Sequence, residues 1–147
     1  MKKLSIILIA LLMFTGCRTL GMAVIDQNFQ EAEQILSVGN KWEIDEPDHT
    51  GTTPLLYAAS YGHPAMVKWL LDKGANINVQ HKYTGETALL YGSYYGNIAV
   101  ITILLDRGVD INQKNNTGYN ALEYARKYHW TDIEKLLIEK GAIPIYK

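Results

Sequence analysis

The apolar residues of this chain follow a helical spacing, and the same arrangement recurs along the sequence. In three segments they are spaced by one, three and four residues, which places them on one stripe of a helix, and a glycine ends each segment. The stripes are Met66, Val67, Leu70 and Leu71 before Gly74; Val100, Ile101, Leu104 and Leu105 before Gly108; and Ile133, Leu136 and Leu137 before Gly141. The pattern predicts three helices at equivalent positions of a repeat.

A second block precedes each of these helices. Residues 51–62, 85–96 and 118–129 align without gaps, at offsets of 34 and then 33 residues. In every block the fifth residue is Leu, and the seventh and eleventh are Tyr. A period of this length is typical of a solenoid built from helix-turn-helix units. Upstream, residues 28–39 retain the second helix of such a unit, and Ala23-Val24 indicates a trace of the first.

Two motifs resemble those of the ankyrin repeat. Thr53-Pro54-Leu55 with Ala58-Ala59 is similar to the start of its first helix. The exit from its second helix is matched by Gly74-Ala75-Asn76-Ile77-Asn78 and by Gly108-Val109-Asp110-Ile111-Asn112. The family's signature histidine is replaced by Leu56, Leu90 and Glu123.

The resemblance implies an all-α fold, an ankyrin-repeat solenoid of stacked helix-turn-helix units with β-turn or hairpin fingers. The repeat domain spans 22–147, with units at 22–47 (degenerate), 48–81, 82–114 and 115–147. Loss of the signature histidine is expected to remove its usual hydrogen bond and leave the fold unchanged.

Four local signals refine the predicted helix ends. Asn28 followed by Glu31 favours a helix start, and Thr131-Asp132-Ile133-Glu134 matches a capping box. Pro64 falls in a first turn, where its missing N–H costs nothing. His129 replaces the glycine of the turn between helices, so we expect a positive φ there.

The first 16 residues have the pattern of a secretory leader. Lys2 and Lys3 precede a largely apolar run, Leu4 to Phe14, and then Thr15-Gly16-Cys17. A membrane-spanning helix needs about 20 apolar residues, so the run is too short for one. The alternative is an uncleaved hydrophobic anchor.

Phe14-Thr15-Gly16-Cys17 resembles the lipobox of bacterial lipoproteins. The resemblance implies cleavage before Cys17, acylation of that residue, attachment to a lipid bilayer and a short tether at 17–21. It places the protein in the bacterial cell envelope, facing the periplasm. Arg18, where Asp would favour the inner membrane, points to the outer membrane.

Charge and cysteine content exclude several classes of function. The formal net charge is −1, and without Lys2 and Lys3 the remaining 12 basic residues face 15 acidic ones, giving −3. This balance provides no basic field for nucleic acid. Cys17 is the only cysteine, which excludes an internal disulfide and a thiolate metal cluster.

No pattern in the sequence indicates catalysis. His49, His63, His81 and His129 do not share metal-ligand spacing, and no serine-nucleophile elbow or phosphate-binding glycine loop is present. Asp72 and Asp106 recur at one repeat position and are interpreted as a solvated face. We therefore predict no catalytic residue, no metal and no cofactor, and a protein that is not an enzyme.

Tyrosines form two ladders with the period of the repeat. In ankyrin proteins the first position, here Tyr57, Tyr91 and Tyr124, tends to pack between helices, so we interpret it as core with hydroxyls at the rim. The second ladder, Tyr61, Tyr95 and Tyr128, is predicted to line the concave side where the family holds its partners. Tyr94 and Lys127 lie beside it. Tyrosine suits such a surface because it combines large area with few rotamers.

Partners of ankyrin proteins also contact the finger tips. The residues predicted to do so here are His49, Thr50, Thr52, Tyr83, Thr84, Glu86, Asn116, Thr117 and Tyr119. The segment Asn78–Gly85 is one residue longer than the next equivalent one, so we expect its finger to protrude.

The sequence thus predicts a lipid-anchored periplasmic module that binds a protein. The sharper hypothesis is an immunity protein that neutralises a toxic secreted enzyme, such as a phospholipase or cell-wall hydrolase. The alternative is a structural scaffold or adaptor of an envelope complex.

Overall fold

The computed structural model describes residues 19–38 and 44–145, which contain eight α-helices in four consecutive pairs. No β-strand occurs in these two ranges, where a single antiparallel bridge joins Gln80 and Thr87. The helices are α2 (Leu20–Ile25), α3 (Phe29–Val38), α4 (Pro54–Ser60), α5 (Pro64–Asp72), α6 (Ala88–Tyr95), α7 (Ile98–Asp106), α8 (Ala121–Lys127) and α9 (Thr131–Glu139).

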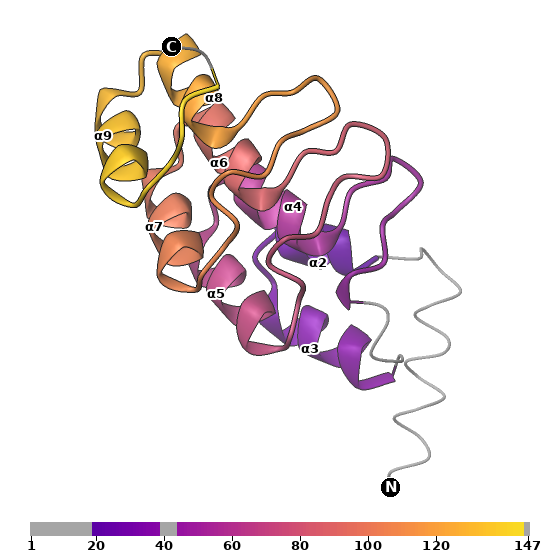
Figure 1. Cartoon of the computed structure of the whole chain (residues 1–147). Helices are drawn as coiled ribbons and strands as arrows, with labels where there is room; N and C mark the ends of the chain where they lie inside the picture. The colour runs from indigo at the N-terminus through magenta and orange to yellow at the C-terminus, as the bar shows by residue number, and fades with distance from the viewer. Residues whose placement is uncertain (1–18, 39–43, 146–147) are drawn as a thin grey trace, which may run out of the picture.

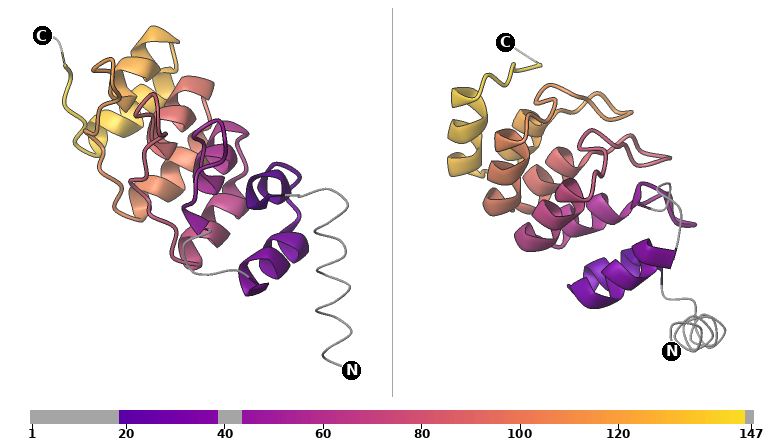
Figure 2. Two further views of the ribbon diagram at one scale, coloured as in Figure 1. Left: turned by 90° about the vertical axis from the view of Figure 1, so that its right-hand side faces the viewer. Right: turned by 90° about the horizontal axis from the view of Figure 1, so that it is seen from below.

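The pairs stack into two layers (Figure 1). Helices α2, α4, α6 and α8 form the inner layer, each packed on the next, and α5, α7 and α9 continue the outer layer that α3 begins. Long loops between the pairs project from the same side of the stack (Figure 2). This arrangement confirms the predicted solenoid of helix-turn-helix units.

One continuous core lies between the two layers. It contains Leu55, Leu89 and Leu122 at equivalent points of the inner layer, together with Val67, Ile101 and other apolar residues of the outer one. Leu56 and Leu90, which occupy the place of the signature histidine, are fully buried as well. Apolar packing therefore takes the place of the histidine's hydrogen bond. Burial of each leucine side chain stabilises the fold by about 2 kcal/mol.

The helix ends follow the local sequence with one exception. Pro54 and Pro64 open α4 and α5, and Asn28 with Glu31 forms the expected reciprocal pair, Glu31 N to Asn28 Oδ1 at 3.1 Å and Asn28 Nδ2 to Glu31 Oε2 at 3.0 Å.

The capping box predicted at Thr131 is wrong. Trp130 occupies the N-cap of α9, and Thr131 is already the first helical residue. Glu134 instead accepts a hydrogen bond from Arg126 Nε over 2.9 Å. The preceding His129 has φ 60°, as predicted, and this left-handed residue turns the chain into α9 one residue earlier than the motif suggests.

The N-terminal helix begins at Leu20, two residues before the predicted start of the repeat domain. Leu20 and Gly21, assigned to the tether by the sequence, are buried in α2. The predicted leader and Cys17 lie outside the described residues. Within the part of the chain that the structure describes, no helix has both the length and the apolarity needed to cross a bilayer.

Side chains at the turns between paired helices link successive units. In each case a ring or amide nitrogen reaches a backbone carbonyl near the end of the preceding inner helix. The contacts are His63 Nε2 with Ile25 O at 3.0 Å, Asn97 Nδ2 with Ala59 O at 2.8 Å, and Trp130 Nε1 with Tyr94 O at 3.4 Å. Each bond gives a carbonyl near a helix end a donor from the next unit, although the Ala59 carbonyl also accepts from Gly62 N.

A row of ion pairs and a row of hydrogen bonds join the units on the outer side. In both rows the later unit supplies the donor. The ion pairs are Lys73–Glu33, Arg107–Asp72 and Lys140–Asp106, and the backbone N–H groups of Asn76, Asp110 and Ile143 donate to Asp45, Asn78 and Asn112.

Candidate functional site

The inner helices end in a cluster of exposed tyrosines. Tyr61 immediately follows α4 and is 56% exposed, while Tyr95 is the last residue of α6 and is 51% exposed. Beside it, Tyr94 is 40% exposed. We call Tyr61, Tyr94, Tyr95 and Tyr128 the tyrosine surface.

Tyr94 joins the ends of α6 and α8. Its ring centroid lies 4.8 Å from that of Tyr95, 4.8 Å from that of Tyr128 and 5.5 Å from that of Tyr124, all in edge-on geometry. Edge-on contacts of this length are favourable. The third repeat therefore contributes two adjacent rings to the surface, where the second contributes only Tyr61.

Tyr128 is less accessible than the predicted ladder implies. It is half-buried, because Tyr94 and Tyr124 cover parts of its ring and Lys127 Nζ lies 5.6 Å from its centroid. A hydrogen bond with the Tyr94 hydroxyl, followed by burial, raises the pKa of Tyr128.

The first ladder has the structural role that the sequence indicates. Tyr57, Tyr91 and Tyr124 pack against the core, and Tyr124 is only 8% exposed. The Tyr57 hydroxyl donates to Asp48 Oδ2 over 2.6 Å, and the Tyr124 hydroxyl donates to Glu86 Oε1 over 2.7 Å. Burial raises the pKa of both phenols, and their carboxylate partners raise it further.

Each finger is closed by one polar side chain near its start. Asp48 Oδ1 accepts from the backbone N–H groups of Thr50 and Thr52, and Asn115 Oδ1 accepts from those of Thr117 and Tyr119. The sequence analysis did not single out Asp48 or Asn115. The available signal was a polar residue three positions before the finger's glycine, a common turn pattern.

The middle finger uses an imidazole for the same purpose. His81 Nδ1 accepts from the backbone N–H groups of Tyr83 and Thr84, both at 3.3 Å. Its backbone N–H bonds to Glu86 O, five residues on, whereas Asp48 N bonds to Thr52 O, four residues on. This extra residue is the one predicted from the sequence, and Tyr83 at the tip is 59% exposed.

The finger residues predicted to contact a partner divide into two groups. His49, Thr50, Tyr83, Thr84, Asn116 and Thr117 are exposed, whereas Thr52, Glu86 and Tyr119 are partly buried. The three partly buried residues contact other parts of the protein itself. The prediction that their side chains are freely accessible to a partner is therefore wrong. Glu86 Oε1, for example, accepts from Tyr124 and from Asn115 Nδ2, both in the next unit.

The fingers also contact one another. The Tyr83 ring lies against Gly51 of the preceding finger, and Lys82 N donates to Gly51 O over 3.0 Å. Asn116 N donates to Thr84 O, and Asn116 Nδ2 donates to Tyr83 O over 2.9 Å. The fingers therefore form a linked row beside the tyrosine surface.

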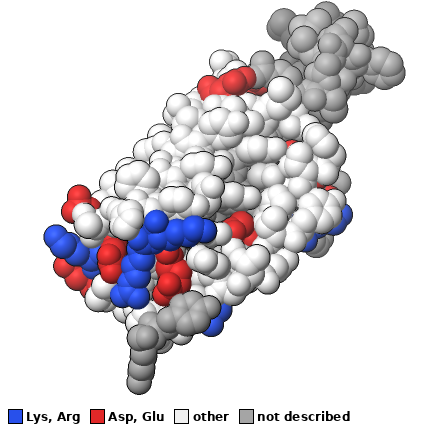
Figure 3. Space-filling view, turned by 90° about the horizontal axis from the view of Figure 1, so that it is seen from above, with Lys and Arg blue, Asp and Glu red and all other residues white. Residues whose placement is uncertain are grey.

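Charge is sparse on the upper face of the molecule. Seen from above, most of the face carries no Lys, Arg, Asp or Glu, and charged side chains gather toward the C-terminal end (Figure 3). Asp48 is held as an anion within the first finger. Burial alone would raise its pKa, but hydrogen bonds from Thr50, Tyr57 and Thr52 lower it to about 2.

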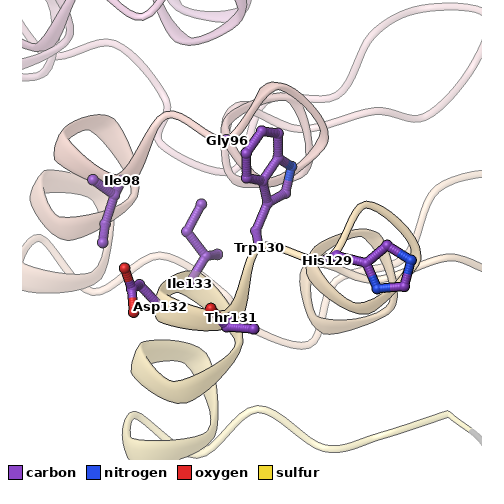
Figure 4. A pocket seen from close by; sticks show the side chains of 7 residues that line it. All are labelled: Gly96, Ile98, His129, Trp130, Thr131, Asp132 and Ile133. Carbon is purple, nitrogen blue, oxygen red and sulfur yellow. The ribbon is translucent and has the colours of Figure 1, made fainter.

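A shallow hollow lies on another part of the surface, where α7 and α9 begin. It is lined by Gly96, Ile98, His129, Trp130, Thr131, Asp132 and Ile133 (Figure 4). In the close-up the His129 ring points away from Asp132, so the two titratable side chains do not converge. The described ranges also contain no group of three His, Cys, Asp or Glu side chains able to hold a metal ion.

Stacked helix pairs with a row of fingers along one side define a solenoid repeat protein. Residues 20–115 and 78–146 match the family model described as ankyrin repeats in three copies. The chain belongs to the ankyrin-repeat family. Ankyrin repeats are protein–protein interaction modules, and proteins built from them are typically binding proteins without enzymatic activity.

Proposed function

We propose that the tyrosine surface and the exposed finger tips hold a protein partner. The observation that carries this proposal is the exposure of Tyr61, Tyr94 and Tyr95 on a packed layer of helices. Tyrosine is over-represented at binding hot spots, since one rigid side chain supplies apolar area and a hydroxyl. A platform already fixed by its own packing loses little conformational entropy when a partner binds.

The proposed module is anchored to a membrane of the bacterial envelope through acylated Cys17 and faces the periplasm, at the outer membrane in preference to the inner. The support is the leader-like sequence and the short distance along the chain from Cys17 to Leu20. Three residues span at most about 11 Å, so the repeat domain would lie close to the bilayer.

A bound partner would therefore be held near the membrane. We propose that this partner is a toxic secreted enzyme, a phospholipase or a cell-wall hydrolase, and that binding neutralises it. An enzyme that attacks lipid or cell wall must reach its substrate at the place where the tethered domain would meet it.

A binding experiment with matched variants tests the proposal. The full-length chain is used as bait in an extract of the producing organism's envelope and secreted proteins, beside the double variant Tyr61→Ala, Tyr95→Ala. Recovery of one hydrolase by the wild type, with loss of its activity on binding, supports neutralisation. The double variant should recover none of it, while Ile98→Ala on α7 should bind as the wild type does.

Other outcomes would contradict parts of the proposal. Recovery of resident envelope proteins that stay active would favour a scaffold. Equal recovery by the double variant would exclude the tyrosine surface. The anchor is tested separately by the mass of the mature chain, because Cys17→Ser should abolish both the acyl mass and membrane association.

A further inference from the structure

The acidic side chains at the tyrosine surface are already engaged. Asp48 accepts hydrogen bonds from Thr50, Thr52 and the Tyr57 hydroxyl. Glu86 receives two donors from the next unit on its Oε1 atom. Donors within the protein therefore occupy most of these carboxylate oxygens, and the remaining Glu86 Oε2 atom is buried, so few of them can accept from a partner.

The basic side chains of the inner layer differ from one another. Helix α8 ends with Arg126 and Lys127. Arg126 pairs with Glu134 at 2.9 Å and with Glu123 at 3.7 Å. In the ranges that the structure describes, no carboxylate lies within 4.0 Å of Lys127 Nζ.

Aromatic rings hold the Lys127 ammonium in place. Its Nζ atom lies 5.1 Å from the ring centroid of Tyr119 and 5.6 Å from that of Tyr128. A ring face attracts a cation without neutralising it, so the positive charge is positioned and still available. The ring centroid of Tyr128 in turn lies 4.8 Å from that of Tyr94, and the hydroxyls of these two tyrosines interact with each other.

The repeat pattern determines the position of the Lys127 charge along the stack. Lys127 occupies the position that Ser60 and Tyr94 occupy in the two preceding units. The tyrosine surface therefore changes along the stack, from uncharged over α4 and α6 to positive at the end of α8.

We propose that Lys127 anchors an acidic side chain, Asp or Glu, of the protein partner. This inference rests on the proposed partner-binding role of the tyrosine surface. The partner's carboxylate pairs with the Lys127 ammonium and accepts a further hydrogen bond from the neighbouring phenols, while apolar residues of the same segment cover Tyr94 and Tyr95. Because the cation stands at one end of the surface, the pair also sets the direction in which the segment lies.

A selection from a random peptide library tests the proposal without the natural partner. Peptides are selected on the full-length chain, and those that lose affinity for Tyr95→Ala are kept as ligands of the tyrosine surface. We expect them to share one Asp or Glu at a fixed distance from an apolar residue. Each selected peptide is then synthesised in two forms, one with the shared Asp or Glu and one with the corresponding Asn or Gln in its place.

The decisive measurement is a double-mutant cycle between Lys127 and the peptide's acid. Lys127→Met should weaken binding of the acidic peptide by about ten-fold and leave the amide peptide unchanged. Lys127→Gln should behave as Lys127→Met does, and Lys127→Glu should weaken acidic peptides further. Lys68→Met, an exposed lysine on α5, is the matched control and should have no effect.

The outcomes separate two failures. Peptides that require Tyr95 but show no coupling to Lys127 would overturn the acidic anchor and leave the binding surface standing. If no selected peptide requires Tyr95, the proposed function itself fails.

Discussion

The indole Nε1 of Trp130 donates a hydrogen bond to the backbone carbonyl of Tyr94 over 3.4 Å. The same ring lies against Gly96 at the turn after α6. Trp130 thus fixes the end of the helix that carries Tyr94 and Tyr95, so the shape of the tyrosine surface depends on a residue of the following unit.

Two glycines with the same positive φ separate backbone strain from side-chain packing. Gly96 and Gly108 both have φ 77°. A Cβ at Gly96 would lie 2.8 Å from the Trp130 ring, whereas among the described residues nothing lies within 4 Å of one at Gly108. Gly108→Ala should lower the free energy of unfolding by about 1 kcal/mol, from φ strain alone. Gly96→Ala should lower it by about 1 to 3 kcal/mol more.

Urea unfolding followed by circular dichroism measures both values. Equal losses in the two variants would show that the Trp130 ring accommodates the added methyl group without cost, and would contradict the predicted clash at Gly96.

The two tyrosine ladders should respond differently to removal of the hydroxyl. Tyr124→Phe leaves Glu86 Oε1 with one donor fewer, while the buried Oε2 already has no partner, so we expect a loss of about 1 to 3 kcal/mol in unfolding free energy. Tyr61→Phe, at an exposed position, should change it by less than about 0.5 kcal/mol. Thermal unfolding of the two variants gives the comparison, and a loss at Tyr61 as large as that at Tyr124 would contradict the assignment of core and surface.

Truncation of the exposed ladder should separate binding from folding. Tyr61→Ala with Tyr95→Ala removes exposed rings, so the unfolding free energy should fall by less than about 1 kcal/mol. Partner affinity should drop by about a hundred-fold, as expected for the loss of aromatic hot-spot residues. Calorimetric titration and a melting curve on the same sample measure both quantities. Loss of folding together with binding would place these rings in the core.

Acid should weaken the first finger through Asp48. The pKa of this carboxyl is about 2 in the folded chain and about 3.9 in an unfolded one. A depressed folded pKa contributes stability that is fully present above pH 4 and is lost as the pH falls from about 4 to about 2. Urea midpoints measured across that range should therefore decrease.

Asp48→Asn is the matched variant, because Asn115 already closes the last finger with an amide. The variant should keep the turn and lose part of the acid dependence. An unchanged acid dependence in Asp48→Asn would assign the effect to other carboxyls.

The exposed ion pairs between outer helices should matter little. Arg107 and Asp72 are 2.7 Å apart, with side chains 36% and 52% exposed. Arg107→Gln should lower the unfolding free energy by less than about 1 kcal/mol at low salt, and the difference should shrink at high salt because screening weakens exposed pairs. Denaturant curves at two ionic strengths provide the check. A large loss that does not depend on salt would require a packing role for the Arg107 stem.

The helix pairs could be predicted from periodicity, because the residues that a helix buries on one face recur about every 3.6 positions along the chain. The spacing of Leu70, Leu104 and Leu137 therefore identifies the core side of the outer helices from the sequence alone. The longer middle finger could be predicted in the same way, by counting residues between repeat glycines. Such features depend on spacing along the chain, which the sequence states directly.

Contacts across units could not be predicted in this way. Tyr128 belongs to the exposed ladder by its repeat position, yet Tyr94 takes the place of Ser60 in its unit and covers the ring. By its position in the repeat, Glu86 is a finger-tip residue. In the structure, however, it accepts hydrogen bonds from Asn115 and Tyr124 of the next unit. Thr131 matches a capping motif, but Trp130 takes the cap position as it reaches back to α6.

Most bonds that link the units point one way; among the finger contacts the exception is Gln80 Nε2, which donates to Lys114 O of the next unit over 3.4 Å. At the helical turns, at the backbone contacts of Lys82 and Asn116 in the finger row and among the outer ion pairs, the later unit supplies the N–H or ammonium and the earlier one the oxygen. The stack therefore has a direction, because each unit presents mainly hydrogen-bond donors to the preceding unit and mainly acceptors to the following one. A duplicated unit inserted in the same orientation would bring one complete set of donors and one of acceptors, whereas a reversed unit would set oxygen against oxygen.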